Sequence, residues 1–158
     1  LEPQQAMYLP AGELHGYLEG VGIELMANSD NVLRGGLTPK HIDVQELLAV
    51  LNFTDGDANI LSPEILTSGE AIFSTEAEEF VLSVIRIRKA APFNGPRNRS
   101  VEMMMCTEGE VTVTDLSAGE TTLLTKGASI LVPAALQQYR IEGEGILYKA
   151  AVPVEESN

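Results

Sequence analysis

The segment from His15 to Lys40 carries the side chains of this sequence that are best suited to chemistry. It holds one imidazole, two carboxylates besides Glu19, and then two cations set among glycines; these are His15, Glu24, Asp30, Arg34 and Lys40. An imidazole is a common metal ligand, and a guanidinium offers a planar fork of donors that suits an enediolate or a phosphate. The inventory therefore favours a small anionic substrate that is handled beside a metal.

Composition limits the kinds of partner that the chain can have. The 158 residues carry a net charge of −13, with 23 acidic and 10 basic side chains, which disfavours nonspecific binding to nucleic acids or anionic membranes. The apolar runs are far too short to span a bilayer. The single cysteine, Cys106, excludes an internal disulfide, fits a reducing, cytoplasmic location, and is expected to be a buried and inert thiol.

Most of the chain has the pattern of β-strands. Short, largely apolar runs bounded by Gly, Pro or polar residues are typical of strands. Their density favours a sandwich or jelly roll, and the methionines 103–105 are expected in a core strand. The cations Arg86, Arg88, Lys89, Arg97 and Arg99 are expected to be solvated turn charges, with a second phosphate site as the alternative. The predicted strands are 6–9, 21–27, 71–75, 80–88, 101–106, 110–115, 120–124, 128–132, 137–142 and 145–151.

One helix is predicted over residues 43–52. Asp43 is suited to the N-cap, and Glu46 follows three residues later, as in a capping box. The apolar residues of this helix have the spacing of one buried face, which predicts a connector that packs on the sheet. They are Val44, Leu47, Leu48 and Leu51.

The pattern of residues 5–25 recurs at residues 128–148. In both copies an apolar strand meets Pro-Ala, a turn follows, and a second strand contains Gly-x-Gly. This pattern predicts two hairpins, in which the glycines relieve crowding or allow a bulge. His15 aligns with Gln138, so the later hairpin lacks the candidate ligand.

Two motifs in this region carry a resemblance to known families. Pro10-Ala11-Gly12-x-x-His15 resembles a cupin motif whose histidine is a metal ligand inside a β-barrel. The longer segment His15–Lys40 closely resembles a signature of type I mannose-6-phosphate isomerases, although Gly16 and Gly35 stand where that family has alanine. The matching positions are His15, Tyr17, Gly20, Glu24, Met26-Ala27, Ser29-Asp30-Asn31, Arg34, Gly36 and Thr38-Pro39-Lys40.

The resemblance implies a fold and an activity. The family has two jelly-roll-like cupin domains with a helical insertion, and it interconverts mannose 6-phosphate and fructose 6-phosphate through a cis-enediol. Its zinc ion is held by four ligands, a Gln, two His and a Glu. His15 matches the histidine that is the last of these four ligands. Arg34 matches an arginine regarded as an active-site residue. The other three ligands belong to an N-terminal part of the catalytic domain that this sequence does not contain.

The remaining residues of the segment have several roles open to them. Isomerisation needs a base near the reacting carbons and an electrophile for the enediolate oxygen. Glu24 or Asp30 could orient a hydroxyl or the arginine, or shuttle a proton, although Asp30 also suits a plain turn. Lys40 suits a phosphate or a solvated loop, and Tyr17 is expected to share a strand face with His15 and line the pocket. His41 is expected on the surface, outside the ligand set.

The expected organisation has three parts. Residues 1–42 would be the last strands of a catalytic cupin domain, 43–62 a helix and linker, and 63–158 a C-terminal cupin-like jelly roll. A chain with one ligand is expected to hold no catalytic zinc and to be inactive alone, and its orphaned N-terminal strands are expected to be disordered, to pack on the later domain or to self-associate. The alternatives are a non-enzymatic sugar-phosphate-binding or regulatory module and a small stand-alone cupin enzyme.

Overall fold

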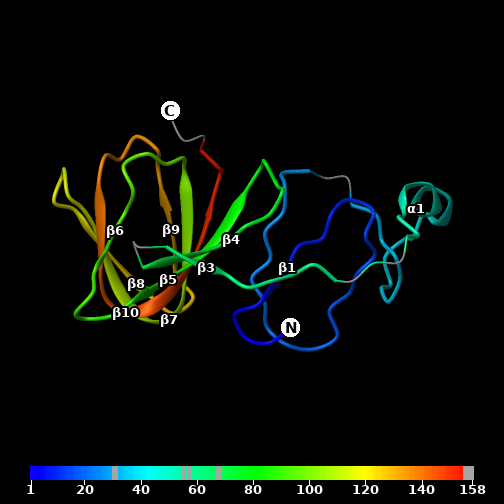
Figure 1. Cartoon of the computed structure of the whole chain (residues 1–158), viewed down its shortest axis with the longest axis horizontal. Helices are drawn as coiled ribbons and strands as arrows, with labels where there is room; N and C mark the ends of the chain where they lie inside the picture. The colour runs from blue at the N-terminus through cyan, green and yellow to red at the C-terminus, as the bar shows by residue number, and fades with distance from the viewer. Residues whose placement is uncertain (30–31, 55, 57, 67–68, 155–158) are drawn as a thin grey trace. The chain divides into compact units, whose positions relative to one another are not determined.

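The computed structural model describes residues 1–29, 32–54, 56, 58–66 and 69–154, and it is mainly β (Figure 1). The chain separates into two compact units, Leu1–Leu61 and Ser62–Asn158. Among the described residues, no helix is long and apolar enough to cross a membrane. The predicted mainly β fold with one short helix is confirmed.

The N-terminal unit has little regular structure. Its two short strands, β1 (Ala6–Met7) and β2 (Ile60–Leu61), pair antiparallel. The helix α1 (Val44–Val50) begins after Asp43, whose side chain accepts a hydrogen bond of 3.1 Å from the Glu46 amide. The helix and its N-cap are therefore confirmed.

Two predictions for this unit are wrong. Residues 21–27 form no strand, because apolar residues alone do not supply the neighbouring strand that a ladder needs, and the early hairpin is absent. The expected buried face of α1 is also absent. No residue of the helix is buried, and Val44 and Leu48 are 57% and 55% exposed. The helical spacing aligns these side chains, but burial needs a partner surface.

The C-terminal unit is one antiparallel sheet that curls around a core (Figure 1). Its order is β3-β4-β5-β10-β7-β8, with β6 also on β10 and β9 also on β7. Such a closed arrangement of antiparallel strands agrees with the predicted jelly roll. The strands are β3 (Glu64–Ile65), β4 (Glu70–Phe73), β5 (Val81–Ile87), β6 (Phe93–Asn94), β7 (Glu102–Asp115), β8 (Thr121–Thr125), β9 (Ser129–Val132) and β10 (Tyr139–Ala151).

The two longest strands, β7 and β10, each replace two predicted strands. The later hairpin was wrongly predicted, because β9 and β10 each pair with β7 instead of with each other. The glycines do relieve crowding: a Cβ at Gly143 or Gly145 would lie 2.6 Å from a carbonyl oxygen of β7. A register shift follows between Ile146 and Leu147. Glycine thus lets long strands pass closely without ending them.

Alternate residues of the strands fill the core. Cys106 is fully buried, as predicted, and burial raises the pKa of its thiol, an effect that a hydrogen bond with the backbone of Glu108 reduces. Met104 is also fully buried, but Met103 and Met105 are 55% and 42% exposed. The methionine run is therefore a core strand only at its central residue, since neighbouring side chains of a strand point to opposite faces.

A substitution at Gly109 should show how much stability depends on this close passage. Gly109 has a φ of +72°, and a Cβ there would lie 2.1 Å from the Glu144 carbonyl oxygen. Gly119 has nearly the same φ, +75°, but has open space around it. We expect Gly119→Ala to cost about 1–2 kcal/mol for the left-handed backbone alone. Gly109→Ala should cost about 1–3 kcal/mol more, because the backbone it meets cannot turn away.

Urea unfolding of the two alanine variants measures this difference directly. Equal losses at both positions would mean that backbone conformation, and not the contact between β7 and β10, determines the requirement for glycine.

Candidate functional site

The loop that leads to His15 is fixed by the end of α1. The Asn52 amide donates to the Gly12 carbonyl at 2.9 Å, and the Asn52 side chain donates to the Glu13 carboxylate at 3.2 Å. Gly12 has a φ of +84°, and a Cβ there would lie 2.8 Å from the Val50 carbonyl oxygen. Glycine is therefore required in this Pro-Ala-Gly turn, which sets the direction of the chain toward His15.

Three of the predicted site residues lie together in the N-terminal unit. The His15 and Tyr17 rings meet edge to face, with centroids 5.8 Å apart. The Tyr17 hydroxyl donates to Glu24 Oε1 at 3.0 Å, and His15 Nδ1 lies 3.1 Å from the Glu13 carbonyl oxygen. His15 and Tyr17 were expected on one strand face; they are neighbours, but the segment that carries them is not a strand.

The surroundings of Tyr17 alter the pKa of its phenol. Desolvation, the hydrogen bond to Glu24 and the charge of Glu24 all raise the pKa of its phenol. Because the side chain is 75% exposed, desolvation is a weak cause here and the Glu24 carboxylate is the better explanation. The hydroxyl is therefore held protonated, as a donor toward Glu24.

The two predicted cations stand apart from this group. Arg34 and Lys40 are both exposed. Within the described part of the chain, neither side chain has a hydrogen bond or an ion pair, and the Thr38 hydroxyl contacts only the backbone amide of Lys40, at 3.2 Å. Asp30 lies outside the described residues. His41 is exposed, as predicted.

A complete metal site is not found in the parts of the chain that the structure describes. No three His, Cys, Asp or Glu side chains among those residues are grouped so as to hold an ion. Zinc in proteins takes three or four such ligands. The residues present therefore do not fit a whole zinc site, and His15 is at most one ligand of it.

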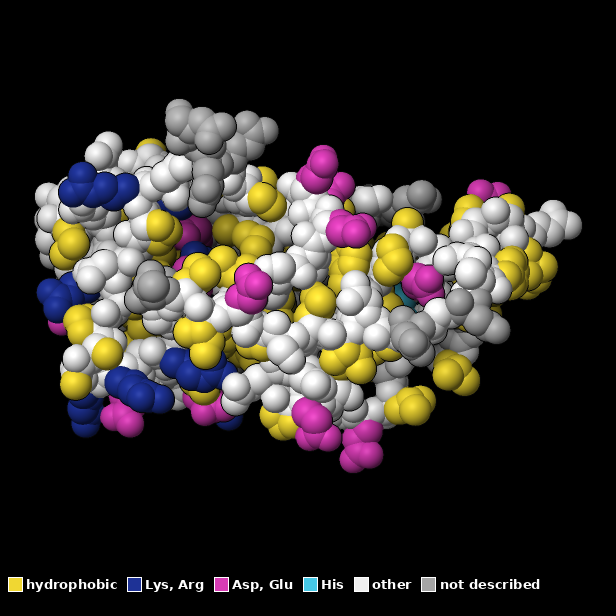
Figure 2. Space-filling view, in the orientation of Figure 1, with side chains coloured by type: hydrophobic (Ala, Val, Ile, Leu, Met, Phe, Trp, Pro, Cys, Tyr) yellow, Lys and Arg dark blue, Asp and Glu magenta, His cyan; other side chains and the backbone are white. Residues whose placement is uncertain are grey.

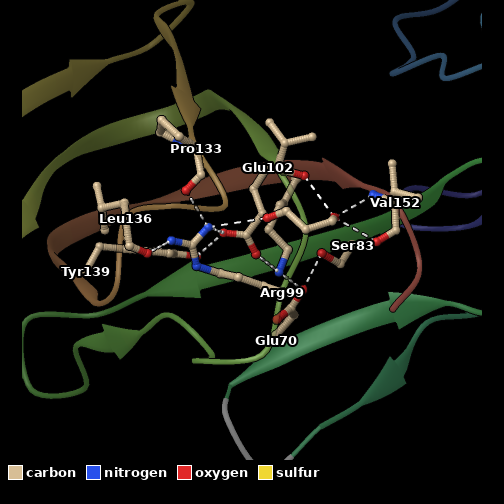
Figure 3. Close-up of polar contacts among 11 residues, drawn as sticks. Glu70, Ser83, Arg99, Glu102, Pro133, Leu136, Tyr139 and Val152 are labelled. Carbon is tan, nitrogen blue, oxygen red and sulfur yellow. Dashed lines mark hydrogen bonds and ion pairs between the residues drawn. The ribbon is translucent and has the colours of Figure 1, made fainter. Parts of the chain in front are cut away.

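A second polar cluster, which sequence reasoning missed, lies inside the C-terminal unit (Figure 3). We call it the barrel network. Glu70, Ser83, Lys149 and Glu102 come from the strands β4, β5, β10 and β7, which are neighbours in the sheet, and all four are buried. Lys149 Nζ lies 2.8 Å from Glu70 Oε1 and 3.0 Å from Glu102 Oε1. The Ser83 hydroxyl donates to Glu70.

Arg99 and Tyr139 complete the barrel network. The Tyr139 hydroxyl donates to Glu102 Oε2 at 2.8 Å, and Arg99 Nη1 lies 3.7 Å from the same oxygen. The guanidinium also lies over the Tyr139 ring, 5.3 Å from its centroid, and donates to the carbonyls of Pro133 and Leu136. Burial, and then the charge of Glu102, raises the pKa of Tyr139. Arg99 was expected to be solvated; its side chain is only 3% exposed.

One signal in the sequence could have revealed the barrel network. Glu102 and Lys149 each lie two residues from a core residue of the same strand, Met104 and Leu147. A charge that continues the inward alternation of a strand has to be buried and paired.

Comparison with known proteins identifies the family. Residues 69–152 match the model described as "Mannose-6-phosphate isomerase, cupin domain". Mannose-6-phosphate isomerase of Escherichia coli is 34% identical over 148 residues, which are 93% of this chain and 37% of that protein. Mannose-6-phosphate isomerase 2 of Arabidopsis thaliana is 33% identical over 157 residues, 96% of this chain and 34% of that protein.

Solved structures agree with this result. The apo form of mannose 6-phosphate isomerase from Salmonella typhimurium superimposes with a TM-score of 0.67 and 28% identity, over 82% of this chain and 32% of that one. The chain thus spans a little over a third of the length of these curated relatives. Since the family model covers more than half of the chain, the chain belongs to the mannose-6-phosphate isomerase family of cupin proteins.

Proposed function

We propose that this chain is part of a zinc-dependent aldose–ketose isomerase that interconverts mannose 6-phosphate and fructose 6-phosphate through a cis-enediol. The observation that carries the proposal is the grouping of His15, Tyr17 and Glu24, within the signature segment, in a chain of this family. A metal-binding imidazole, an oriented carboxylate and cations that can bind an anion are the groups that a sugar-phosphate isomerisation uses.

Each residue of the segment has a proposed role. His15 supplies one zinc ligand, and the other ligands come from residues outside this chain. Arg34 binds the enediolate or the phosphate with its fork of donors, and Lys40 binds the phosphate as a point charge. Glu24, held by Tyr17, and Asp30 orient a sugar hydroxyl or move a proton. The exposure of Arg34 and Lys40, with no described carboxylate beside them, supports a role toward an anion.

The domain organisation forms part of the same proposal. Residues 1–42 belong to the catalytic cupin domain, 43–62 form a helix and linker, and 63–158 form the second cupin domain. The division of the chain into units after Leu61 supports this assignment. Exposed apolar side chains of the first unit, such as Leu18 at 94%, support self-association when the rest of that domain is lacking.

A non-enzymatic module that binds a sugar phosphate is the second candidate. The observation in its favour is the lack of a grouped ligand set among the described residues. Such a module would bind mannose 6-phosphate without converting it, whatever metal is added.

Metal analysis and an isomerase assay of the purified chain test the main proposal. With a single ligand, the chain alone should hold far less than stoichiometric zinc after dialysis and should show no turnover. Stoichiometric zinc accompanied by turnover would contradict the proposal that ligands from outside the chain are needed. Tight binding of mannose 6-phosphate by the chain alone, again without turnover, would favour the module.

A further inference from the structure

The C-terminal unit contains a cavity of about 540 Å³, which lies above the barrel network. Clefts of this size commonly hold small ligands. The walls include the apolar side chains of Ile72, Phe80 and Val152, and the floor includes Glu70, Arg99, Glu102 and Lys149. In Figure 2, acidic and basic atoms lie deep in a hollow of this unit, with hydrophobic atoms beside them.

The charges of the floor balance one another. Two carboxylates, Glu70 and Glu102, face two cations, Lys149 and Arg99, and at most 7% of any of these side chains is exposed. An anionic ligand would meet the carboxylates in a poorly solvated space, and a cationic ligand would meet Lys149 and Arg99. The balanced floor therefore favours a neutral ligand.

The floor nevertheless keeps hydrogen-bonding capacity that the protein does not use. Both hydrogen-bond contacts of Glu70 end on Oε1, so that Oε2 receives no donor from the described residues. Lys149 has three N–H groups and two carboxylate partners. Arg99 Nε is buried without an acceptor. An acceptor and donors thus lie side by side, and a hydroxyl group is the neutral group that serves both.

The edges of the cavity also carry hydrogen-bonding groups that the described residues leave unused. Asn94 and Asn98 line it, are exposed, and have amide side chains without a partner among the described residues. Phe80 offers an aromatic wall against which a C–H face can pack. We infer that this cavity is a binding site for a small neutral molecule that carries several hydroxyl groups, such as a polyol or an unphosphorylated monosaccharide. None of the residues that line the cavity belongs to the His15–Lys40 segment.

Titration of the isotopically labelled whole chain, followed by NMR, tests the inference. The probes are D-mannitol and D-mannose, with inorganic phosphate as the anionic comparison. We expect saturable shifts of the Asn94 and Asn98 side-chain amides and the Ala151 backbone amide with at least one neutral probe, and none with phosphate. Shifts with phosphate alone, or shifts confined to residues 13–40, would overturn the inference, as would the absence of saturable shifts with both neutral probes.

Two variants connect binding to the cavity. Ala77 lines it, and Ala77→Phe should fill part of it and weaken binding at least tenfold, whereas Ala118→Phe, in an exposed turn, should bind as the parent does. Asn98→Ala changes only an exposed side chain, so folding is not at risk. It should weaken binding about two- to tenfold through a lost hydrogen bond. Unchanged binding in both Ala77→Phe and Asn98→Ala would place the ligand elsewhere and overturn the inference.

Discussion

Replacing Glu102 by glutamine is expected to lower the free energy of unfolding by about 3–5 kcal/mol, as the loss of one partner from a buried ion pair does. The Glu102 side chain is 1% exposed. Lys149 Nζ lies 3.0 Å from its Oε1. The Tyr139 hydroxyl donates to its Oε2 at 2.8 Å, and Arg99 Nη1 lies 3.7 Å from the same oxygen. Without this carboxylate, Glu70 alone would balance two buried cations. The desolvation of the unpaired charge produces the loss.

Glu110→Gln is the matched control, because Glu110 lies on the same strand but is exposed. It should change stability by no more than about 0.5 kcal/mol. The double variant Glu102→Gln/Lys149→Met should be more stable than Glu102→Gln, since it removes the charge left unpaired. Urea unfolding measures all three variants. Equal losses for Glu102→Gln and Glu110→Gln would mean that the barrel network is solvated.

The strands of the second unit were predictable where apolar alternation is regular. The bounds of β4, β5, β8 and β9 lie within two residues of the predicted ones. The predicted bounds of β7 and β10 failed near Gly109 and Gly143, because a strand was ended before each glycine, although the repeat had placed Gly143 inside a strand. In the fold these glycines provide backbone clearance inside continuous strands. The two-residue strands β2, β3 and β6 were not predicted, because a pairing so short leaves no periodic pattern.

The partners within the barrel network could not be predicted, because they depend on strand register. Ala151 pairs with Glu102 across β10 and β7, and Lys149 pairs with Ser83 across β10 and β5. Residues that are far apart in the sequence thus share one inward face, and the sequence alone does not specify these pairings. The contact between Tyr17 and Glu24 is different, because it is local and its residues were already recognised by their motif.

The proposed roles of His15 and Arg34 predict large losses of activity in an enzyme that contains this chain. A chimera in which the chain replaces its aligned segment of the Escherichia coli isomerase provides such an enzyme. His15→Ala should lower both zinc content and turnover, because the site loses a ligand. Arg34→Ala should lower kcat by about 10²–10³-fold with zinc retained, as the loss of a donor to the developing oxyanion does. Arg34→Lys should have a kcat between those of Arg34→Ala and the parent, because an ammonium group keeps the charge but is not a planar fork of donors.

His41→Ala is the matched control for this experiment, because His41 is also an exposed histidine but has no place in the proposed ligand set. It should leave zinc content and turnover unchanged. Zinc is measured by mass spectrometry, and turnover by a coupled assay on chimeras with the circular dichroism of the parent. Retention of zinc by His15→Ala would contradict its role as a ligand. An equal loss of zinc in Arg34→Ala would mean that the arginine maintains the metal site and does not act on the substrate. The separation of metal content from turnover therefore distinguishes a ligand from a substrate-binding cation within the same short segment.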